Sequence, residues 1–440
     1  MTRLRFSLVA VVALHAAPAQ ARITKGPWVQ RVGTTSAVVR VEVDPPSAAS
    51  LEVNAGADGG AARTMQDADV KALHAFALDA LAPATRYTYS VHAGDASKLA
   101  SFTTAPPDDT TTPFRFLVYG DNRTDDAAHA GVVRAMVASP ADLLIHTGDF
   151  VENGGSLPQW QRFFEIEAPL LEARVLVSAV GNHELVDGSG VSYVKFFGPP
   201  NGERVAKPEH LNHTFRWGST RFFLLNGLDH FKPASAERSW LEKVLSDADG
   251  EKGLTWRVVV VHHGPWSSGP HGGNPRLHER GVPALFKRHG VDLVLSGHDH
   301  VYERGLGAGL PFVVSGGGGA PLYKLRARIP ESRKSETVHH FVEADVGPRV
   351  MQLTALRADG SRIERCALSK DAEGWFCGDL AATPPDGGAP ALGEPEKAPA
   401  PGAAPSPRCS CRAAGDARGA GAAFPWALAL VAYAVRRRRY

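Results

Sequence analysis

The chain has 440 residues, 43% hydrophobic and 21% charged, so it can bury a sizeable core and is too long for one ordinary domain. Its 48 Lys and Arg residues nearly balance 46 Asp and Glu residues, and a net charge of +2 gives no electrostatic case for a nucleic-acid partner. All four cysteines follow residue 365, so any metal in the main body must be held by histidines and carboxylates.

Residues 1–21 have the order of a secretory signal peptide. The charged start MTRLR is followed by the apolar run Phe6–Ala17 and then by the small-residue sequence Ala19-Gln20-Ala21. This order predicts export, with cleavage after Ala21. A short core helix is the alternative interpretation of the apolar run.

Residues 22–108 are predicted to form an all-β sandwich. Short alternating runs such as Ala37–Val43 are separated by Pro and Gly, which is typical of a small antiparallel sandwich. The sequence LAPATRYTY at residues 81–89 resembles the tyrosine-bearing strand of fibronectin type III domains. The resemblance implies a fibronectin type III-like N-terminal domain.

Residues 112–370 change to an α/β pattern, in which apolar strands alternate with helical stretches. The expected helices include Asp126–Ala138 and Leu277–His289. The expected strands are Phe116–Tyr119, Leu143–Ile145, Val175–Val180, Val258–Val261 and Leu293–Leu295.

A polar cluster follows each of these five strands. The clusters are GDNR at 120–123, GD at 148–149, GNHE at 181–184, HHGPW at 262–266 and GHDH at 297–300. A Gly-Asp pair alone is usually a turn, but residues just past the strand ends of an α/β sheet converge on one crevice. Carboxylates and imidazoles suit Zn, Fe or Mn, and there are more of them than one ion needs, which predicts two metal ions.

The ordered motifs GDNR, GD, GNHE, VVHHGPW and GHDHVYER resemble those of the calcineurin-like metallophosphoesterases, most closely the purple acid phosphatase branch, which also carries a fibronectin-like domain before its catalytic domain. The resemblance implies an α/β fold of the αββα sandwich type. It also implies a dinuclear site bridged by Asp149, with Asp121 and His300 on the first ion and Asn182, His263 and His298 on the second. In the His262-His263 pair we expect His263 to be the ligand, because it precedes Gly-Pro-Trp, and His262 to lie in the core or behind the ligands.

The resemblance implies two catalytic histidines outside the ligand set. His183 corresponds to the family histidine that gives a proton to the leaving alkoxide, and a structural hydrogen-bonded role is the alternative. His271 lies on the loop where the family places substrate-facing histidines, so we expect it to contact the phosphate.

Two positions depart from the family pattern. The tyrosine ligand of purple acid phosphatases falls at Glu152, so the purple colour is not expected, and Glu152 is either an oxygen ligand or solvated. Arg123 stands where other metallophosphoesterases have a histidine. It is expected either to contact a phosphate oxygen or to pair with a structural carboxylate.

The C-terminus has three predicted parts. Cys366 and Cys377 are close enough in sequence to form a disulfide in an oxidising compartment. Residues 380–407, rich in Pro, Ala and Gly, are expected to be a flexible linker. Residues 409–440 contain a Cys motif, a transmembrane stretch at 419–435 and an Arg cluster, an order that resembles the myxobacterial-type C-terminal sorting tag; a plain tail anchor is the alternative.

Together these features predict an exported, surface-associated, dinuclear phosphoesterase that hydrolyses phosphate mono- or diesters by attack of a metal-bound hydroxide. Its partners would be a small phosphate ester and, through the C-terminus, a membrane. The alternative is a surface binding or adhesion protein whose catalytic domain has decayed. A zinc peptidase is not favoured, since the paired-histidine helix motif is absent from the sequence.

Overall fold

The computed structural model describes residues 20–55, 62–108, 112–186, 190–198, 211–228, 231–325, 327–378, 380 and 392–396. The predicted signal peptide up to residue 19, most of the predicted linker and the whole of 409–440 lie outside these ranges. Within the described ranges, no helix has both the length and the apolar character of a membrane span.

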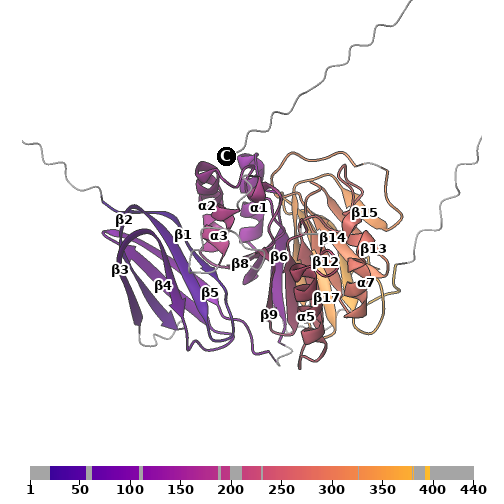
Figure 1. Ribbon diagram of the computed structural model, residues 1–440, viewed down its shortest axis with the longest axis horizontal. Coiled ribbons are helices and arrows are strands. Elements are labelled where there is room, and N and C mark those ends of the chain that lie inside the picture. Colours follow the sequence, from indigo (N-terminus) through magenta and orange to yellow (C-terminus); the bar gives the residue numbers. More distant parts are fainter. Residues whose placement is uncertain are drawn as a thin grey trace, which may run out of the picture. The chain divides into compact units, whose positions relative to one another are not determined.

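The N-terminal part is built from antiparallel strands (Figure 1). Strand β2 pairs with β1 through its first half and with β4 through its second half, while β3 follows both halves. The change of partner falls at Pro45 and Pro46, which cannot donate to a strand ladder. The fibronectin type III assignment stays a prediction. The strands are β1 Arg22–Gln30, β2 Ala37–Ala55, β3 Arg63–Leu78, β4 Arg86–Ala93 and β5 Ala96–Thr103.

The first sheet of the α/β part contains three parallel strands that continue on one side into antiparallel ones. It also continues into the N-terminal strands, because β1 and β8 pair in parallel at Val29 and Val175. Its own strands are β6 Phe114–Tyr119, β7 Leu143–His146, β8 Val175–Ser178, β16 His340–Val346, β17 Val350–Arg357, β18 Arg362–Ser369 and β19 Phe376–Cys377.

The second sheet has the order β15-β13-β14-β12-β11-β10-β9, with β10, β11, β12 and β14 parallel. The strands predicted at 258–261 and 293–295 form its centre. Its strands are β9 His213–Trp217, β10 Thr220–Leu225, β11 Trp256–Val261, β12 Leu293–Ser296, β13 Tyr302–Gly307, β14 Leu310–Ser315 and β15 Ser332–Glu336.

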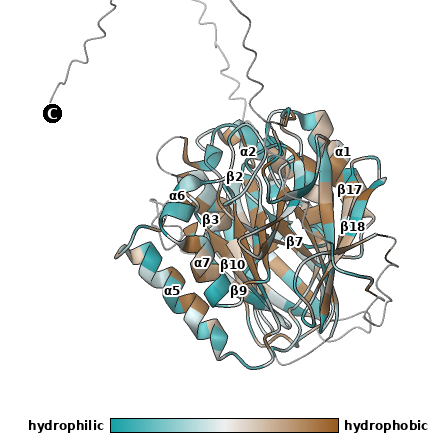
Figure 2. Cartoon of the chain, turned by 90° about the vertical axis from the view of Figure 1, so that its right-hand side faces the viewer, coloured by the Kyte–Doolittle hydropathy of each residue, from teal (hydrophilic) through white to brown (hydrophobic). Residues whose placement is uncertain are grey.

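Helices pack on the outer face of each sheet. The helix predicted over Leu277–His289 was wrong as a single element: it is two helices, because Gly281 adopts a left-handed φ of 65° between them and Pro283 lies in the first turn of the second. The helices are α1 Asp126–Val137, α2 Leu157–Leu171, the 3-10 turn η1 His183–Leu185, α3 Val191–Phe197, α5 Ala236–Asp249, α6 Pro275–Glu279 and α7 Val282–Arg288. Figure 2 shows the mixed hydropathy of α5, whose Leu241 and Leu245 are buried.

Successive side chains along a strand face opposite sides of its sheet, and this alternation separates the layers. On β6, Phe116 and Val118 pack between the two sheets, while Leu117 and Tyr119 pack against the helices beside the first sheet. On β11, even-numbered valines face the first sheet and odd-numbered valines face α5 and α7. The order is therefore helix, sheet, sheet, helix, as expected for the αββα fold.

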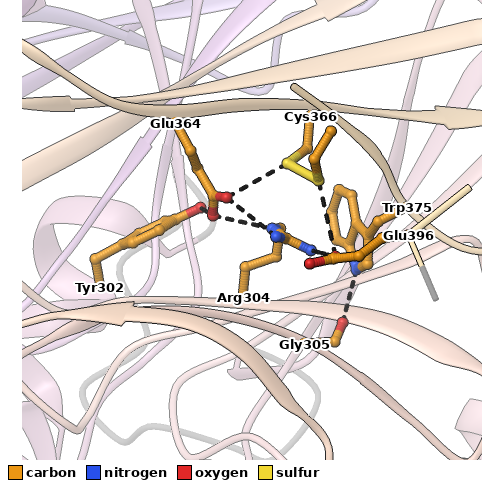
Figure 3. The surroundings of a disulfide bond; sticks show 8 residues. Tyr302, Arg304, Gly305, Glu364, Cys366, Trp375 and Glu396 are labelled. Atoms are coloured by element: carbon orange, nitrogen blue, oxygen red, sulfur yellow. Dashed lines mark hydrogen bonds and ion pairs between the residues drawn. A yellow bond between two sulfur atoms is a disulfide. The ribbon is translucent and has the colours of Figure 1, made fainter. Parts of the chain in front are cut away.

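A buried ion pair joins the two sheets at one edge (Figure 3). Arg304 on β13 contacts Glu364 on β18 with N–O distances of 2.9 and 3.0 Å, and it also contacts Glu396 at 2.7 Å. Beside it, Cys366 and Cys377 form the predicted disulfide between β18 and β19. These contacts fix the last strands of the domain to the second sheet.

Candidate metal centre

The predicted clusters meet where strands of both sheets end. Asp121, Asp149 and His298 follow β6, β7 and β12 and have left-handed φ values of 57°, 60° and 71°. Non-glycine residues rarely adopt this conformation, and such strain gathers at functional sites. The turns allow these side chains to approach one another.

Two glycines leave the room that the carboxylates need. A Cβ on Gly181 would lie 2.2 Å from Asp149 Oδ1, and a Cβ on Gly297 would lie 2.2 Å from Asp121 Oδ2. Any larger residue would displace these carboxylates. The glycines that precede Asn182 and His298 in the motifs are thus required by close approach.

Asp149, Asn182, His262 and His298 form one set of donors, called here the histidine group. His262 Nε2 lies 3.3 Å from Asp149 Oδ1, 3.1 Å from Asn182 Oδ1 and 3.2 Å from His298 Nδ1. Single donor atoms of Asp149, His262 and His298 all lie within 4.8 Å of one another. The His262 Nδ1–H donates to the Thr147 carbonyl at 3.0 Å, which leaves Nε2 for the site.

The structure brings His262 into this group of donors, and not His263, which the sequence favoured as the ligand. His262 has the same parity as Val258 and Val260, which face the first sheet, so its ring points toward the loops that carry Asp149 and Asn182. His263 has the opposite parity, and its Nε2 contacts the Gly272 carbonyl at 3.2 Å. Strand alternation, rather than the following Gly-Pro-Trp, decides which histidine reaches the site.

A second set of donors, called here the arginine group, consists of Asp121, Glu152 and His300 around Arg123 and shares Asp149. His300 donates from Nδ1 to the Pro321 carbonyl at 2.7 Å, and its Nε2 lies 3.6 Å from Asp121 Oδ1. Asp121 accepts the backbone N–H of His298 on both oxygens, at 3.1 and 3.0 Å. The residues predicted for the first ion are therefore together.

Arg123 lies among these donors. Its Nε is 3.3 Å from Asp149 Oδ2, its Nη2 is 3.5 Å from His300 Nε2, and its Nη1 forms an ion pair with Glu152 Oε2. Of the two roles expected for Arg123, the structure contains the pairing with carboxylates. Glu152 is half-exposed and is held by this ion pair.

His183 lies at the rim of both groups. Its Nδ1 contacts the Glu152 carbonyl at 2.7 Å, and its Nε2 is 3.8 Å from Asp149 Oδ2. Its backbone N–H donates to Asp149 Oδ1 at 3.1 Å. The Nε2 atom is thus directed toward the shared carboxylate without belonging to either donor set.

His271 is held by Asp299, the residue between the two histidines of GHDH. The His271 Nδ1 and backbone N lie 3.0 and 3.1 Å from Asp299 Oδ1, and Ser267 donates to Asp299 Oδ2 at 2.6 Å. The His271 ring centre is 4.4 Å from that of His298. His271 therefore lies beside the histidine group, and its expected contact with the phosphate stays a prediction.

Glu184 is a supporting residue that the sequence reasoning missed. Its buried carboxylate accepts the backbone N–H groups of Asp149, Phe150 and Gly181 at 2.9, 2.8 and 2.8 Å. It thereby ties the loop after β7 to the loop after β8. Its place in GNHE was the available signal, because a buried carboxylate must find donors.

The buried charges of the site call for a cation. Burial raises the pKa of Asp121 well above its ordinary value, and burial together with Asp149 raises the pKa of Glu184 to about 7. Burial alone would lower the pKa of His262, but the charges of Asp149 and Asp121 outweigh it and raise that pKa to about 9. A metal ion at the histidine group would replace the His262 proton, since both balance the same carboxylates. Imidazole, amide and carboxylate donors suit Zn, Fe or Mn.

Residues 114–302 match the family model described as calcineurin-like phosphoesterase. The chain therefore carries a calcineurin-like phosphoesterase domain. Over 234 residues it is 29% identical to a probable purple acid phosphatase of Arabidopsis thaliana. The aligned region covers 51% of this chain and 53% of that protein. The chain spans about half the length of the curated relatives it matches.

Two solved structures share the fold. A purple acid phosphatase from yellow lupin (Lupinus luteus) seeds matches with a TM-score of 0.69 and 18% identity, over 78% of this chain and 74% of that chain. PhoD matches with a TM-score of 0.63 and 14% identity, over 82% of this chain and 93% of that chain. The α/β metallophosphoesterase fold predicted from the motifs is thus confirmed.

Proposed function

We propose that this chain is a metal-dependent phosphoesterase of the purple acid phosphatase type, which hydrolyses phosphate mono- or diesters with two ions of Zn, Fe or Mn. The observation that carries the proposal is the sharing of Asp149 by two sets of donors. One carboxylate facing two groups of imidazole and oxygen donors is the arrangement that a two-metal phosphoesterase needs. The domain match over residues 114–302 supports the same class of reaction.

The ions, when bound, supply the Lewis acidity that activates water and neutralises charge on the phosphoryl group. The protein's own side chains position and protonate the reactants. Asp149 is fixed by the backbone N–H of His183 and by the Glu184 carboxylate behind its loop. His183 donates from Nδ1 to the Glu152 carbonyl, so Nε2 is the nitrogen through which the imidazolium form of the ring would give a proton to the departing alkoxide.

The proposal is tested by hydrolysis assays on a metal-stripped protein reconstituted separately with Zn, Mn and Fe. The probes are p-nitrophenyl phosphate, a monoester, and bis(p-nitrophenyl) phosphate, a diester. We expect at least one metal form to hydrolyse one of them, and the chelated protein to be inactive. A metal-loaded protein that hydrolyses neither ester would contradict the proposal and favour the decayed binding protein.

We further propose that the protein is exported and held at the cell surface. The proposal depends on residues 1–21 and 409–440 as sequence patterns. Its test is fractionation of cells that express the full chain, with a second sample in which residues 409–440 are deleted. Surface labelling that persists without those residues would contradict the role given to them.

A further inference from the structure

The guanidinium of Arg123 contacts three of the expected metal-binding side chains at once. Its three nitrogens contact one oxygen of Asp149, one oxygen of Glu152 and the Nε2 atom of His300. These are three of the four side chains that surround the expected position of the first ion, Asp121 being the other. A planar cation with five N–H groups in a fixed fork can bridge such a set, whereas a single ammonium cannot.

The arginine is held in this place from several sides. Only 11% of its side chain is exposed, although Glu152 beside it is 45% exposed. The Tyr323 ring stacks on His300, one of the side chains that Arg123 contacts, with centroids 3.9 Å apart. The contacts come from the loops that follow β6, β7, β12 and β14, so the guanidinium is part of the built site.

His300 shows what this arrangement means for a metal. Its Nδ1 donates to Pro321, so Nε2 is the nitrogen that offers a lone pair, and that lone pair faces Arg123 Nη2 at 3.5 Å. The Oδ2 atom of Asp149 likewise faces Arg123, which is the cation nearest to it. An ion at this position must therefore displace the guanidinium or bind beside a like charge, and both reduce its affinity.

The histidine group carries no such competitor. Among the described residues, the neighbours of His262 Nε2 are Asp149, Asn182 and His298, and none of them bears a permanent positive charge. The charge on an arginine cannot leave at any ordinary pH, so the arginine group always holds a cation of its own. The two positions are therefore unequal.

Resting on the proposed function, we infer that Arg123 is a built-in cation at the first metal position: it makes the protein bind one ion tightly at the histidine group and a second ion only weakly. Arg123 is in this sense a residue that determines metal affinity. It balances the charge of Asp149 and Glu152 when one ion is bound, and it must leave these carboxylates for the second ion to enter.

The test is a metal titration of the chelator-stripped full chain, without any activity measurement. Mn²⁺ is titrated and the ions retained per chain are counted by elemental analysis after equilibrium dialysis. The wild type should retain about one ion tightly and bind a second about 10- to 100-fold more weakly. Arg123→Ala should tighten the second ion by about the same factor, so that two ions are retained.

Two further variants keep the outcome decisive. Arg162→Ala removes another arginine that pairs with two carboxylates, Asp126 and Glu165, and should match the wild type. Arg123→Lys keeps a charge but loses the fork, so its affinity for the second ion should fall between those of the wild type and Arg123→Ala. It carries the test if Arg123→Ala folds poorly. Two equally tight ions in the wild type, or second-ion affinities unchanged in both Arg123 variants, would overturn the inference. If the expected numbers of ions are found but the protein hydrolyses neither ester, the proposed function is overturned and the inference about Arg123 is not.

Discussion

The histidine group and the arginine group are built alike but balance their charge differently. Each has a histidine whose Nδ1 donates to a backbone carbonyl, Thr147 for His262 and Pro321 for His300, and each uses one oxygen of Asp149. In the first group the donors face one another. In the second, the guanidinium of Arg123 stands between them.

The comparison shows that different residues set the positions of the donors and the positive charge that balances them. The positions of the donors are set by strand ends and by backbone carbonyls that orient the histidines, and both groups are built in this way. We call this arrangement the frame of the site. The charge is set by a single long side chain, Arg123, that enters from the loop after β6. The predictions below test the frame and the charge separately.

The largest effect is expected at the residue that both groups share. Asp149→Ala should lose both ions and lower kcat/KM by about a thousandfold or more, because the two ions together lower the barrier by several kcal/mol. Elemental analysis and ester hydrolysis measure the two losses together. Asp126→Ala removes an exposed carboxylate on α1 and should change neither. A metal content of Asp149→Ala equal to that of the wild type would contradict the shared role.

The next prediction separates two adjacent histidines. His262→Ala should weaken the tight ion by more than about 100-fold, since it removes a donor and not only an outer-shell partner. His263→Ala, its matched control, should leave that affinity nearly unchanged, because His263 contacts the Gly272 carbonyl and lies outside the donor set. Metal titration of the two variants checks this. The reverse order of losses would restore His263 as the ligand.

This pair of histidines shows how far the sequence reaches. The strands, the layers and most donors were predictable, because buried parallel strands are apolar runs and their ends converge on one edge. The place of His262 in the donor group was not foreseen, because it depends on which face of β11 each valine occupies. That parity was readable only once the two sheets were known to face each other.

Arg123 illustrates a second limit. Its side chain is long, and its partners Asp149 and Glu152 lie 26 and 29 residues away in the sequence. Local patterns therefore left two roles open, and only the fold brings the partners to the guanidinium. The assignments of the signal peptide, the fibronectin type III-like domain and the C-terminal tag stay predictions.

A smaller effect is expected at His183, which serves the reaction without belonging to either donor group. His183→Ala should keep the metal content of the wild type, because the ring Nε2 lies 3.8 Å from Asp149 Oδ2 and the backbone N–H that holds Asp149 is unchanged. It should slow the hydrolysis of esters with poor leaving groups by about 10²- to 10⁴-fold, and much less for activated phenolates, which depart without a proton. A series of esters with different leaving groups measures this. An equal loss for all esters would make His183 a positioning residue, with His271 the next candidate for the donor.

The smallest effect on catalysis is expected at the edge of the fold that carries neither group. Cys366 and Cys377 are separated by 11 residues, and a disulfide that closes so short a loop typically contributes about 2 to 3 kcal/mol to the free energy of unfolding. The double variant Cys366→Ala/Cys377→Ala should therefore unfold at lower denaturant concentration, while the ions per chain and kcat/KM stay at wild-type values. Wild-type protein treated with a reductant is the matched control and should show the same loss of stability. The buried pair of Arg304 with Glu364 still joins β13 to β18 in that variant, which is why the frame of both donor groups should survive. A loss of either ion in the variant would show that the last strands help to hold the donors, and the separation of frame from charge would then have to include them.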